Sequence, residues 1–200
     1  ACVSSRKTPL TCAAASGDLN AIRMLINAKA IVDAGRPTPL MLAAKGGYEK
    51  AVRVLLNANA APEDRSSSPP LHHAIEGGKP RIVKTLLAAK AQLQATDDEV
   101  VRRADALTVA ARYGNTAIMK ILIDAKAPLE RVDPQTTSLE WIIGLNTPLA
   151  TAIRNGHFDA VKLLLDAKAR IDVPGTDYIH HLIRYAIESS AKSDNNNVFD

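Results

Sequence analysis

The residues that could do chemistry are two histidine pairs, two cysteines and one cluster of acids and arginines. The histidine pairs are His72-His73 and His180-His181, and imidazole nitrogen is a common metal ligand. Adjacent residues on a helix point in different directions, so neither pair is well placed to share one ion. We therefore interpret His73 as part of an apolar framework, and we expect neither a metal nor another cofactor.

The acidic cluster Asp97-Asp98-Glu99 is followed closely by Arg102 and Arg103. Carboxylates of this kind can serve as general acids, general bases or metal ligands. A solvated loop with internal charge pairing is the simpler interpretation. The sequence shows no ordered serine, histidine and acid set, no glycine-rich phosphate loop and no zinc-ligand spacing. We therefore expect no enzyme activity in this chain.

Composition and charge narrow the class of protein further. The 200 residues are 46% apolar and only 4% aromatic, which is typical of helices packed closely through small side chains. The net charge of +4 is too small to predict nucleic-acid binding, which needs basic residues clustered on one face. No apolar run approaches the length that crosses a bilayer, so we expect no membrane insertion.

The chain has only two cysteines, Cys2 and Cys12. A secreted domain held together by disulfides would need more of them. We therefore predict an intracellular and most simply cytoplasmic protein, in which Cys12 is a small core residue.

A repeated motif accounts for most of the chain. Five copies begin at residues 8, 38, 69, 105 and 147, and a weaker, partial copy begins at 181. Thr8, Thr38, Asp105 and Thr147 are suited to cap the N-terminus of a helix. Four copies place a proline where its missing N–H costs nothing. A leucine and an alanine three residues apart then predict one buried face of a short helix.

Each full copy continues with a glycine and a second apolar run. The glycines are Gly17, Gly47, Gly78, Gly114 and Gly156. Glycine readily adopts the left-handed conformation that a tight turn between helices requires. The runs that follow, such as Ala21-Ile22-Arg23-Met24-Leu25-Ile26, predict a longer helix with a charged residue on its outer face. In the fourth run we expect Leu122 to be buried.

This order of cap, proline, leucine, alanine, glycine and leucine run resembles the ankyrin repeat family over about residues 6–190. The resemblance implies an all-α solenoid of stacked helix-turn-helix units with loop or β-hairpin fingers. Short inner helices would line a concave side, and longer outer helices would form the convex side. We expect a disordered N-terminal end over residues 1–5, a single array over 6–190 and a flexible tail over 191–200.

The chain departs from the family pattern where the second helix ends. The position that is usually glycine holds Lys29, Asn59, Lys90, Lys126 and Lys168. A left-handed conformation costs such residues about 1–2 kcal/mol, and asparagine tolerates it best. We predict a positive φ at Asn59 and at most of these lysines. The connections over 92–104 and 128–146 are long, which is typical of loops on a binding face.

The family resemblance also implies the function, which is that of a non-catalytic scaffold that binds a partner protein. The residues before each turn glycine would point toward the concave groove, and they vary in chemistry while the framework does not. With the single tryptophan of the longest insertion, they form the predicted partner-binding set: Lys45, Glu76, Arg112, Tyr113, Arg154, Asn155 and Trp141.

Two further points about this function stay open in the sequence. Trp141 is either an exposed anchor for the partner or buried against the array within its own insertion. Because the set is mildly basic, an acidic segment would suit it as a partner. The alternative to a free-standing scaffold is a regulatory or targeting segment of a larger enzyme, channel or secreted effector. We expect a monomer that does not bind nucleic acid.

Overall fold

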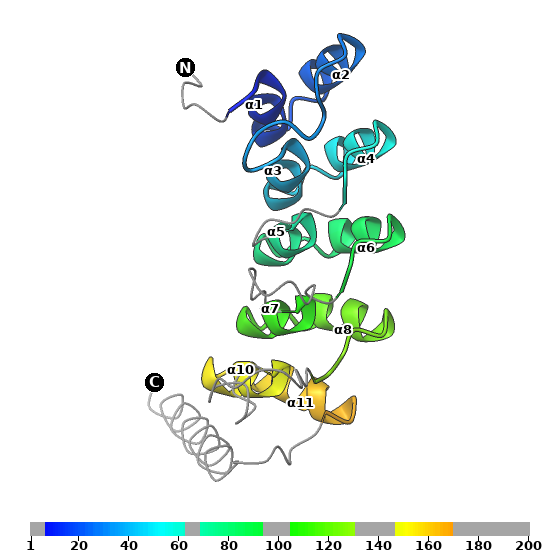
Figure 1. Cartoon of the computed structure of the whole chain (residues 1–200). Coiled ribbons are helices and arrows are strands. Elements are labelled where there is room, and N and C mark those ends of the chain that lie inside the picture. The colour runs from blue at the N-terminus through cyan, green and yellow to red at the C-terminus, as the bar shows by residue number, and fades with distance from the viewer. Residues whose placement is uncertain (1–6, 63–68, 94–104, 131–146, 170–200) are drawn as a thin grey trace, which may run out of the picture. The chain divides into compact units, whose positions relative to one another are not determined.

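The computed structural model describes residues 7–62, 69–93, 105–130 and 147–169 (Figure 1). These residues form five pairs of α-helices and contain no strand. The second helix of every pair has nine residues, and the first has seven or eight. The chain divides into two compact units, Ala1–Ala106 and Leu107–Asp200, called unit 1 and unit 2 below.

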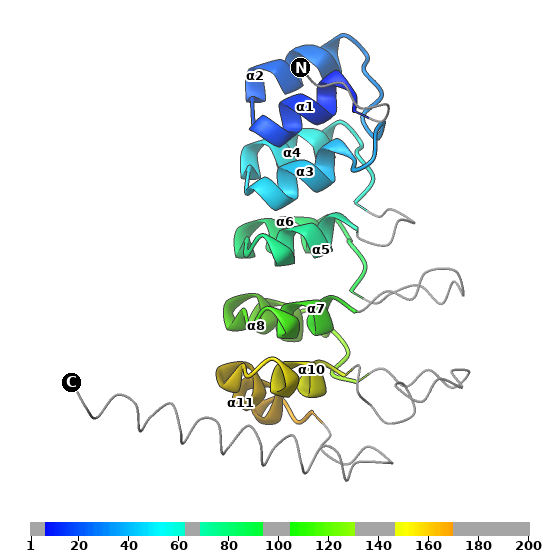
Figure 2. The ribbon, with the colours of Figure 1, turned by 90° about the vertical axis from the view of Figure 1, so that its left-hand side faces the viewer.

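The described residues of unit 1 form three helix pairs. They are α1 (Pro9–Ser16) with α2 (Leu19–Asn27), α3 (Pro39–Gly46) with α4 (Glu49–Asn57), and α5 (Pro70–Glu76) with α6 (Pro80–Ala88). The inner helices α1, α3 and α5 stack in one row, and the outer helices α2, α4 and α6 stack in a second row beside it (Figures 1 and 2). Apolar side chains from both rows form the core, including Leu10, Leu40, Leu71, Ile22, Leu55 and Leu86, all at most 1% exposed.

The described residues of unit 2 form two helix pairs, α7 (Ala106–Arg112) with α8 (Thr116–Asp124) and α10 (Pro148–Arg154) with α11 (Phe158–Asp166); the first residue of α7 is the last of unit 1. The outer helices α8 and α11 pack against each other, and α10 packs against α11. Leu122 of α8 and Leu164 of α11 are fully buried. The predicted burial of Leu122 is therefore confirmed.

The predicted helix starts are confirmed where threonine caps were expected. The side chains of Thr8, Thr38 and Thr147 each accept a hydrogen bond from the backbone N–H three residues later. Proline occupies the first helical turn after each of them. Two outer helices also begin at capping residues, because the Asp18 and Asn115 side chains accept backbone N–H bonds at the starts of α2 and α8. These bonds satisfy donors that the helix itself leaves unpaired.

All five outer helices end at a left-handed residue that is not glycine. The φ angles are 62° at Lys29, 63° at Asn59 and Lys90, 64° at Lys126 and 70° at Lys168, which confirms the prediction. The bonding is that of a Schellman motif: the Lys29 N–H donates to the Ile26 carbonyl, and the Ala30 N–H donates to the Leu25 carbonyl. The strain therefore recurs in every described pair, and each outer helix keeps a left-handed end although it has no glycine there.

Cys12 of α1 differs from its prediction. It is half-buried, so the expectation of a small core residue is wrong, and it forms a disulfide bond. The equivalent residues Leu42 and His73 are also half-buried, which shows that the side of the inner helix at this repeat position is not enclosed by the core.

Several predictions lie outside the described residues. They are those for the N-terminal end 1–5, the acidic cluster 97–99 with Arg102 and Arg103, the longest insertion with Trp141, His180-His181, the partial copy at 181 and the tail 191–200. Within the described ranges, no helix is long and apolar enough to cross a membrane.

Candidate partner-binding site

The predicted binding residues that the structure describes all lie at the C-terminal ends of inner helices. Lys45 is in the last turn of α3, and Glu76 is the last residue of α5. Arg112 and Arg154 are the last residues of α7 and α10, and Tyr113 and Asn155 follow them directly. We call these six residues the inner-end set. Each helix thus presents its variable residues at the same point of its pair, as the repeat spacing predicted.

In unit 1, the inner-end set forms an ion pair between neighbouring pairs of helices. The Lys45 ammonium lies 3.7 Å from a Glu76 carboxylate oxygen, and the two side chains are 60% and 28% exposed. A pair exposed to this degree contributes only about 0–1 kcal/mol to stability. Its more important effect is on the surface, since it joins α3 to α5 and leaves neither charge isolated.

His73 of α5 lies beside this ion pair. Its Nδ1 is 3.6 Å from the same Glu76 oxygen, and the His73 side chain is only 16% exposed. The Nδ1 atom is buried and has no hydrogen-bond partner among the described residues. Burial lowers the pKa of His73 below 6.5; the Glu76 carboxylate opposes this shift, and the Lys45 charge adds to it. His73 is therefore neutral at neutral pH.

Gly77 explains why α3 and α5 approach so closely. A Cβ atom added at this residue would lie 2.6 Å from the Lys45 carbonyl oxygen and 3.2 Å from that of His73. The φ of Gly77 is −73°, which any residue can adopt, so the requirement for glycine here is one of space. The helix end that carries Glu76 is thus held against the one that carries Lys45.

In unit 2, the inner-end set is more exposed and includes an aromatic ring. Arg112, Arg154 and Asn155 are exposed, and Tyr113 is 50% exposed. The amide of Asn155 donates a 2.7 Å hydrogen bond to the Thr151 carbonyl, which fixes that side chain on its own helix. The Tyr113 ring is accessible to a partner. A preformed aromatic surrounded by polar groups has the composition of an interface centre.

His157 supports this surface from the next pair and was not singled out in the sequence. One ring nitrogen, Nε2, is 3.0 Å from the carbonyl oxygen of Arg112. The same ring covers the turn at Gly114, where an added Cβ would lie 2.6 Å from Nδ1. His157 therefore fixes the backbone on both sides of Tyr113, so that the ring is presented on a held turn.

The same arrangement occurs twice in unit 1. Tyr48 and Lys79 occupy the N-cap positions of α4 and α6 without capping them. Their side chains instead cover the turn glycines Gly17 and Gly47 of the preceding pairs, at 2.4 Å and 2.8 Å from an added Cβ. The sequence contained a signal for this role. Tyr48 and Lys79 directly follow a turn glycine, at the position where other copies have the capping residues Asp18 and Asn115.

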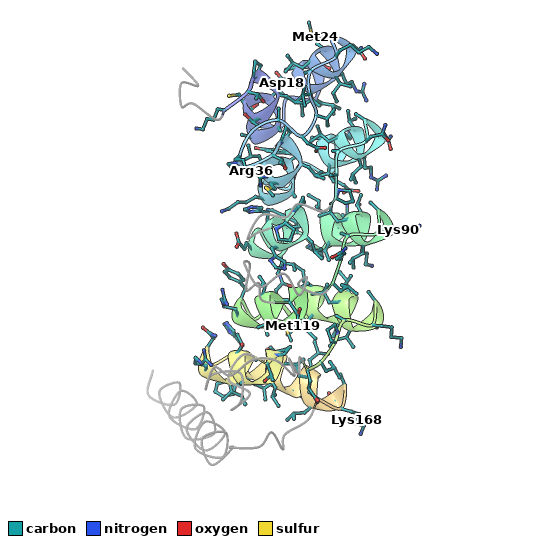
Figure 3. The ribbon with its side chains drawn as sticks, in the orientation of Figure 1. Asp18, Met24, Arg36, Lys90, Met119 and Lys168 are labelled. Carbon is teal, nitrogen blue, oxygen red and sulfur yellow. The ribbon has the colours of Figure 1, made fainter. Side chains whose placement is uncertain are left out.

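An apolar hollow lies on the first helix pair. Its lining includes Pro9, Ala13, Met24 and Leu25, and Met24 is 72% exposed (Figure 3). In the next two pairs the residues equivalent to Leu25 are Leu55 and Leu86, which are fully buried. In α3–α4 and in α5–α6, the preceding helix pair covers this face. The hollow is thus the same stacking face on the first pair.

The described histidine, cysteine and acidic side chains do not cluster around a common metal position. Within them, no group of three or more histidine, cysteine, aspartate or glutamate side chains is placed to hold a metal ion. His72 is buried, and His73, which we interpreted as part of the apolar framework, is half-buried. The exposed charges and Tyr113 are suited to non-covalent recognition.

Comparisons with known proteins agree with this geometry. A family model for ankyrin repeats in three copies matches residues 2–66 and 71–177. Among solved structures, the chain is similar to the human ASB11 ankyrin repeat domain, with 28% sequence identity and a TM-score of 0.71 over 84% of this chain and 72% of that one. No curated protein matches the chain. The helix pairs, their turns and the extent of the family match show that this chain belongs to the ankyrin repeat family.

Proposed function

We propose that this chain is a non-catalytic scaffold that binds a partner protein through the inner-end set. Ankyrin repeats are generally protein–protein interaction modules, and the family is typically non-catalytic. In unit 1 the proposed contacts are Lys45 and Glu76. In unit 2 they are Arg112, Tyr113, Arg154 and Asn155. Trp141 and the finger loops would extend this surface.

One observation supports this proposal above the others. Tyr113 is half exposed, and yet the backbone that carries it is held by the His157 contact with the Arg112 carbonyl. A backbone segment that is already ordered loses little conformational entropy when a partner binds. Aromatic and arginine side chains also dominate the binding energy at interfaces, where truncation of a key residue costs about 2 kcal/mol or more.

The test compares two double variants in binding to purified partners. Proteins captured from native cell extract would be identified, purified and titrated against the chain. Tyr113→Ala with Arg154→Ala should weaken binding by about 30-fold or more, which corresponds to about 2 kcal/mol. Lys120→Ala with Lys162→Ala, on the outer helices of the same unit, is the matched control and should bind as the wild type does. Equal affinities for all three proteins would contradict the proposed site.

The location that we propose is the cytoplasm, and Cys12 provides its test. The disulfide at Cys12 opposes this location, because thiols are kept reduced there and structural disulfides are rare. Alkylation of thiols in intact cells, followed by mass spectrometry of the Cys12 peptide, would decide the matter. Alkylation before any reductant is added supports the cytoplasm; alkylation only after reduction contradicts it.

A further inference from the structure

The outer helices of unit 1 carry an unusually basic surface. Three positions of each repeat, counted three, six and twelve residues after the turn glycine, are exposed on these helices and at their ends. In unit 1 seven of the nine residues there are cations, and the other two are Asn20 and Asn59. The seven, which we call the outer basic face, are Arg23, Lys29, Lys50, Arg53, Arg81, Lys84 and Lys90.

Stacking brings these cations together on one surface. The helices α2, α4 and α6 pack side by side, and stacked helix axes lie about 8–10 Å apart. Within one helix, residues three apart have their Cβ atoms about 5–6 Å from each other, and Lys50 and Arg53 are three apart in α4. Lys90 follows the C-terminal end of α6, and its side chain points away from the inner helices (Figure 3).

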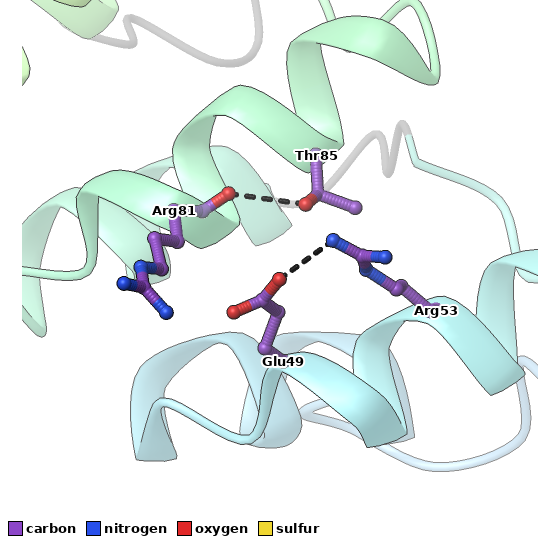
Figure 4. A network of polar contacts seen from close by, with 4 residues as sticks. All are labelled: Glu49, Arg53, Arg81 and Thr85. Atoms are coloured by element: carbon purple, nitrogen blue, oxygen red, sulfur yellow. Dashed lines mark hydrogen bonds and ion pairs between the residues drawn. The ribbon is translucent and has the colours of Figure 1, made fainter.

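Few acids compensate this charge. The outer helices of unit 1 and their flanking residues contain only two acids, Asp18 and Glu49. Asp18 accepts hydrogen bonds from two backbone N–H groups at the start of α2. Glu49 lies 2.7 Å from Arg53 within α4, below Arg81 of α6 (Figure 4). The remaining cations of the face have no acidic neighbour among the described ion pairs.

Unit 2 shows that the fold does not require this surface. At the same three positions, α8 and α11 and their ends carry Ala117, Lys120, Lys126, Asp159, Lys162 and Lys168. Asp124 and Asp166 add two further exposed acids on these helices. The lysines of unit 2 are therefore interspersed with carboxylates, while the same scaffold positions in unit 1 are almost uniformly basic.

We propose that the outer basic face is a second docking surface, and that it binds an acidic segment of a partner protein. Carboxylates one helical turn apart, about 5.4 Å, match the spacing of cations along each outer helix. Carboxylates two helical turns apart, about 11 Å, have nearly the spacing between the axes of stacked helices, which is about 8–10 Å. An acidic helix lying across α2, α4 and α6 would therefore meet successive cations.

The composition of the face favours a protein over other anionic partners. Single-stranded nucleic acids bind by stacking bases on aromatic rings, and the exposed aromatic residues of the described chain, Tyr113 and Phe158, are in unit 2. Helices that insert into a membrane surface combine cations with large apolar side chains. None of the nine positions holds an apolar residue, and the exposed Met24 of α2 lines the apolar hollow of the first helix pair. This surface lies on the other row of helices from the inner-end set and is independent of the proposed function.

The experiment titrates a fluorescein-labelled poly-L-glutamate peptide of about 20 residues with the full chain, followed by fluorescence anisotropy at about 0.15 M salt, where the screening length is about 8 Å. The variant Arg23→Glu with Lys84→Glu reverses two charges of the face. The control Lys120→Glu with Lys162→Glu reverses the cations at the same repeat position in unit 2, so the net charge changes equally. Circular dichroism and thermal melting verify that both variants are folded.

We expect the wild type and the control to bind with affinities within about threefold of each other, and the unit 1 variant to bind at least about tenfold more weakly. Equal weakening in both variants would overturn the proposal, because net charge alone would then explain binding. Absence of binding by the wild type would overturn it as well. An oligouridylate RNA or phosphatidylserine vesicles, if bound more tightly than the peptide with the same sensitivity to the unit 1 variant, would replace the acidic protein as the partner.

Discussion

The close approach of α5 to α3 can be tested by adding a single methyl group, in the variant Gly77→Ala. The new Cβ would lie 2.6 Å from the carbonyl oxygen of Lys45, whereas an ordinary carbon–oxygen contact is about 3.3 Å or longer. The two stacked helices must therefore separate by roughly 0.7 Å at this point, and neither contacting atom belongs to a flexible side chain. Overpacking of this kind costs about 1–3 kcal/mol.

Backbone conformation does not add to this effect at Gly77. Its φ of −73° suits alanine, so the steric contact is the whole expected penalty. Gly156→Ala is the complementary control, because a Cβ there meets nothing within 4 Å while the φ is +71°. That variant isolates the left-handed strain, about 1–2 kcal/mol.

Urea unfolding followed by circular dichroism at 222 nm would measure both changes. In thermal unfolding, which is a second measurement of the same change, a loss of 1 kcal/mol in a unit of about 100 residues lowers the melting temperature by roughly 4–8 °C. Gly77→Ala should also disturb the Lys45–Glu76 pair, which a double-mutant cycle between the two residues would detect as a smaller coupling. A Gly77→Ala protein as stable as the wild type would refute the reasoning, since the helices would then have room for the methyl group.

Three further predictions follow from burial, titration and backbone strain. Leu55→Ala and Leu122→Ala should each lower the free energy of unfolding by about 2–5 kcal/mol, because both leucines are fully buried. Leu25→Ala should lower it clearly less, because Leu25 is only half-buried in the hollow of the first helix pair. Equal losses at Leu25 and Leu55 in urea unfolding would contradict the stacking register. Because burial lowers the folded-state pKa of His73, the unfolded chain binds its proton first as the pH falls below 6.5, so stability should decrease from pH 6.5 downward until the folded pKa is passed. The variant His73→Gln should lose this part of the pH dependence in urea midpoints measured between pH 7.5 and 5, and an unchanged dependence would show that His73 is not its source. Lys90→Gly should raise the free energy of unfolding by up to about 1 kcal/mol, since glycine relieves the strain of a φ of 63° while adding some freedom to the unfolded chain. A lower free energy of unfolding, measured in urea, would mean that the lysine side chain stabilises the helix end.

Much of the backbone could be predicted because its signals are local. Thr8, Thr38 and Thr147 cap their helices through atoms three residues away, and the left-handed ends at Lys29 and Asn59 follow from their place in the repeat. These features depend on hydrogen bonds within one turn, so the order of residues is enough to specify them. The exposure of Tyr113 followed in the same way, from its position directly after an inner helix.

The candidate site was predictable only in part. The sequence placed Lys45 and Glu76 at equivalent ends of two helices, but the distance between their charges, and the burial of His73 beside them, depend on how closely two repeats stack. The contact of His157 with the Arg112 carbonyl joins residues 45 positions apart. Cys12 was predicted wrongly because periodicity indicates a helix face and does not show how completely a neighbouring pair encloses it.

The sequence by itself determined the repeat, the helix boundaries and the family, because each depends on residue types that recur at short and regular spacing. The tertiary structure decided which side chains of different repeats meet. The modest net charge of +4 gave no sign of a basic surface, yet stacking three outer helices gathers seven cations on one face of unit 1. Electrostatic attraction depends on distances in space, and packing sets those distances between residues that lie about 30 positions apart in the chain.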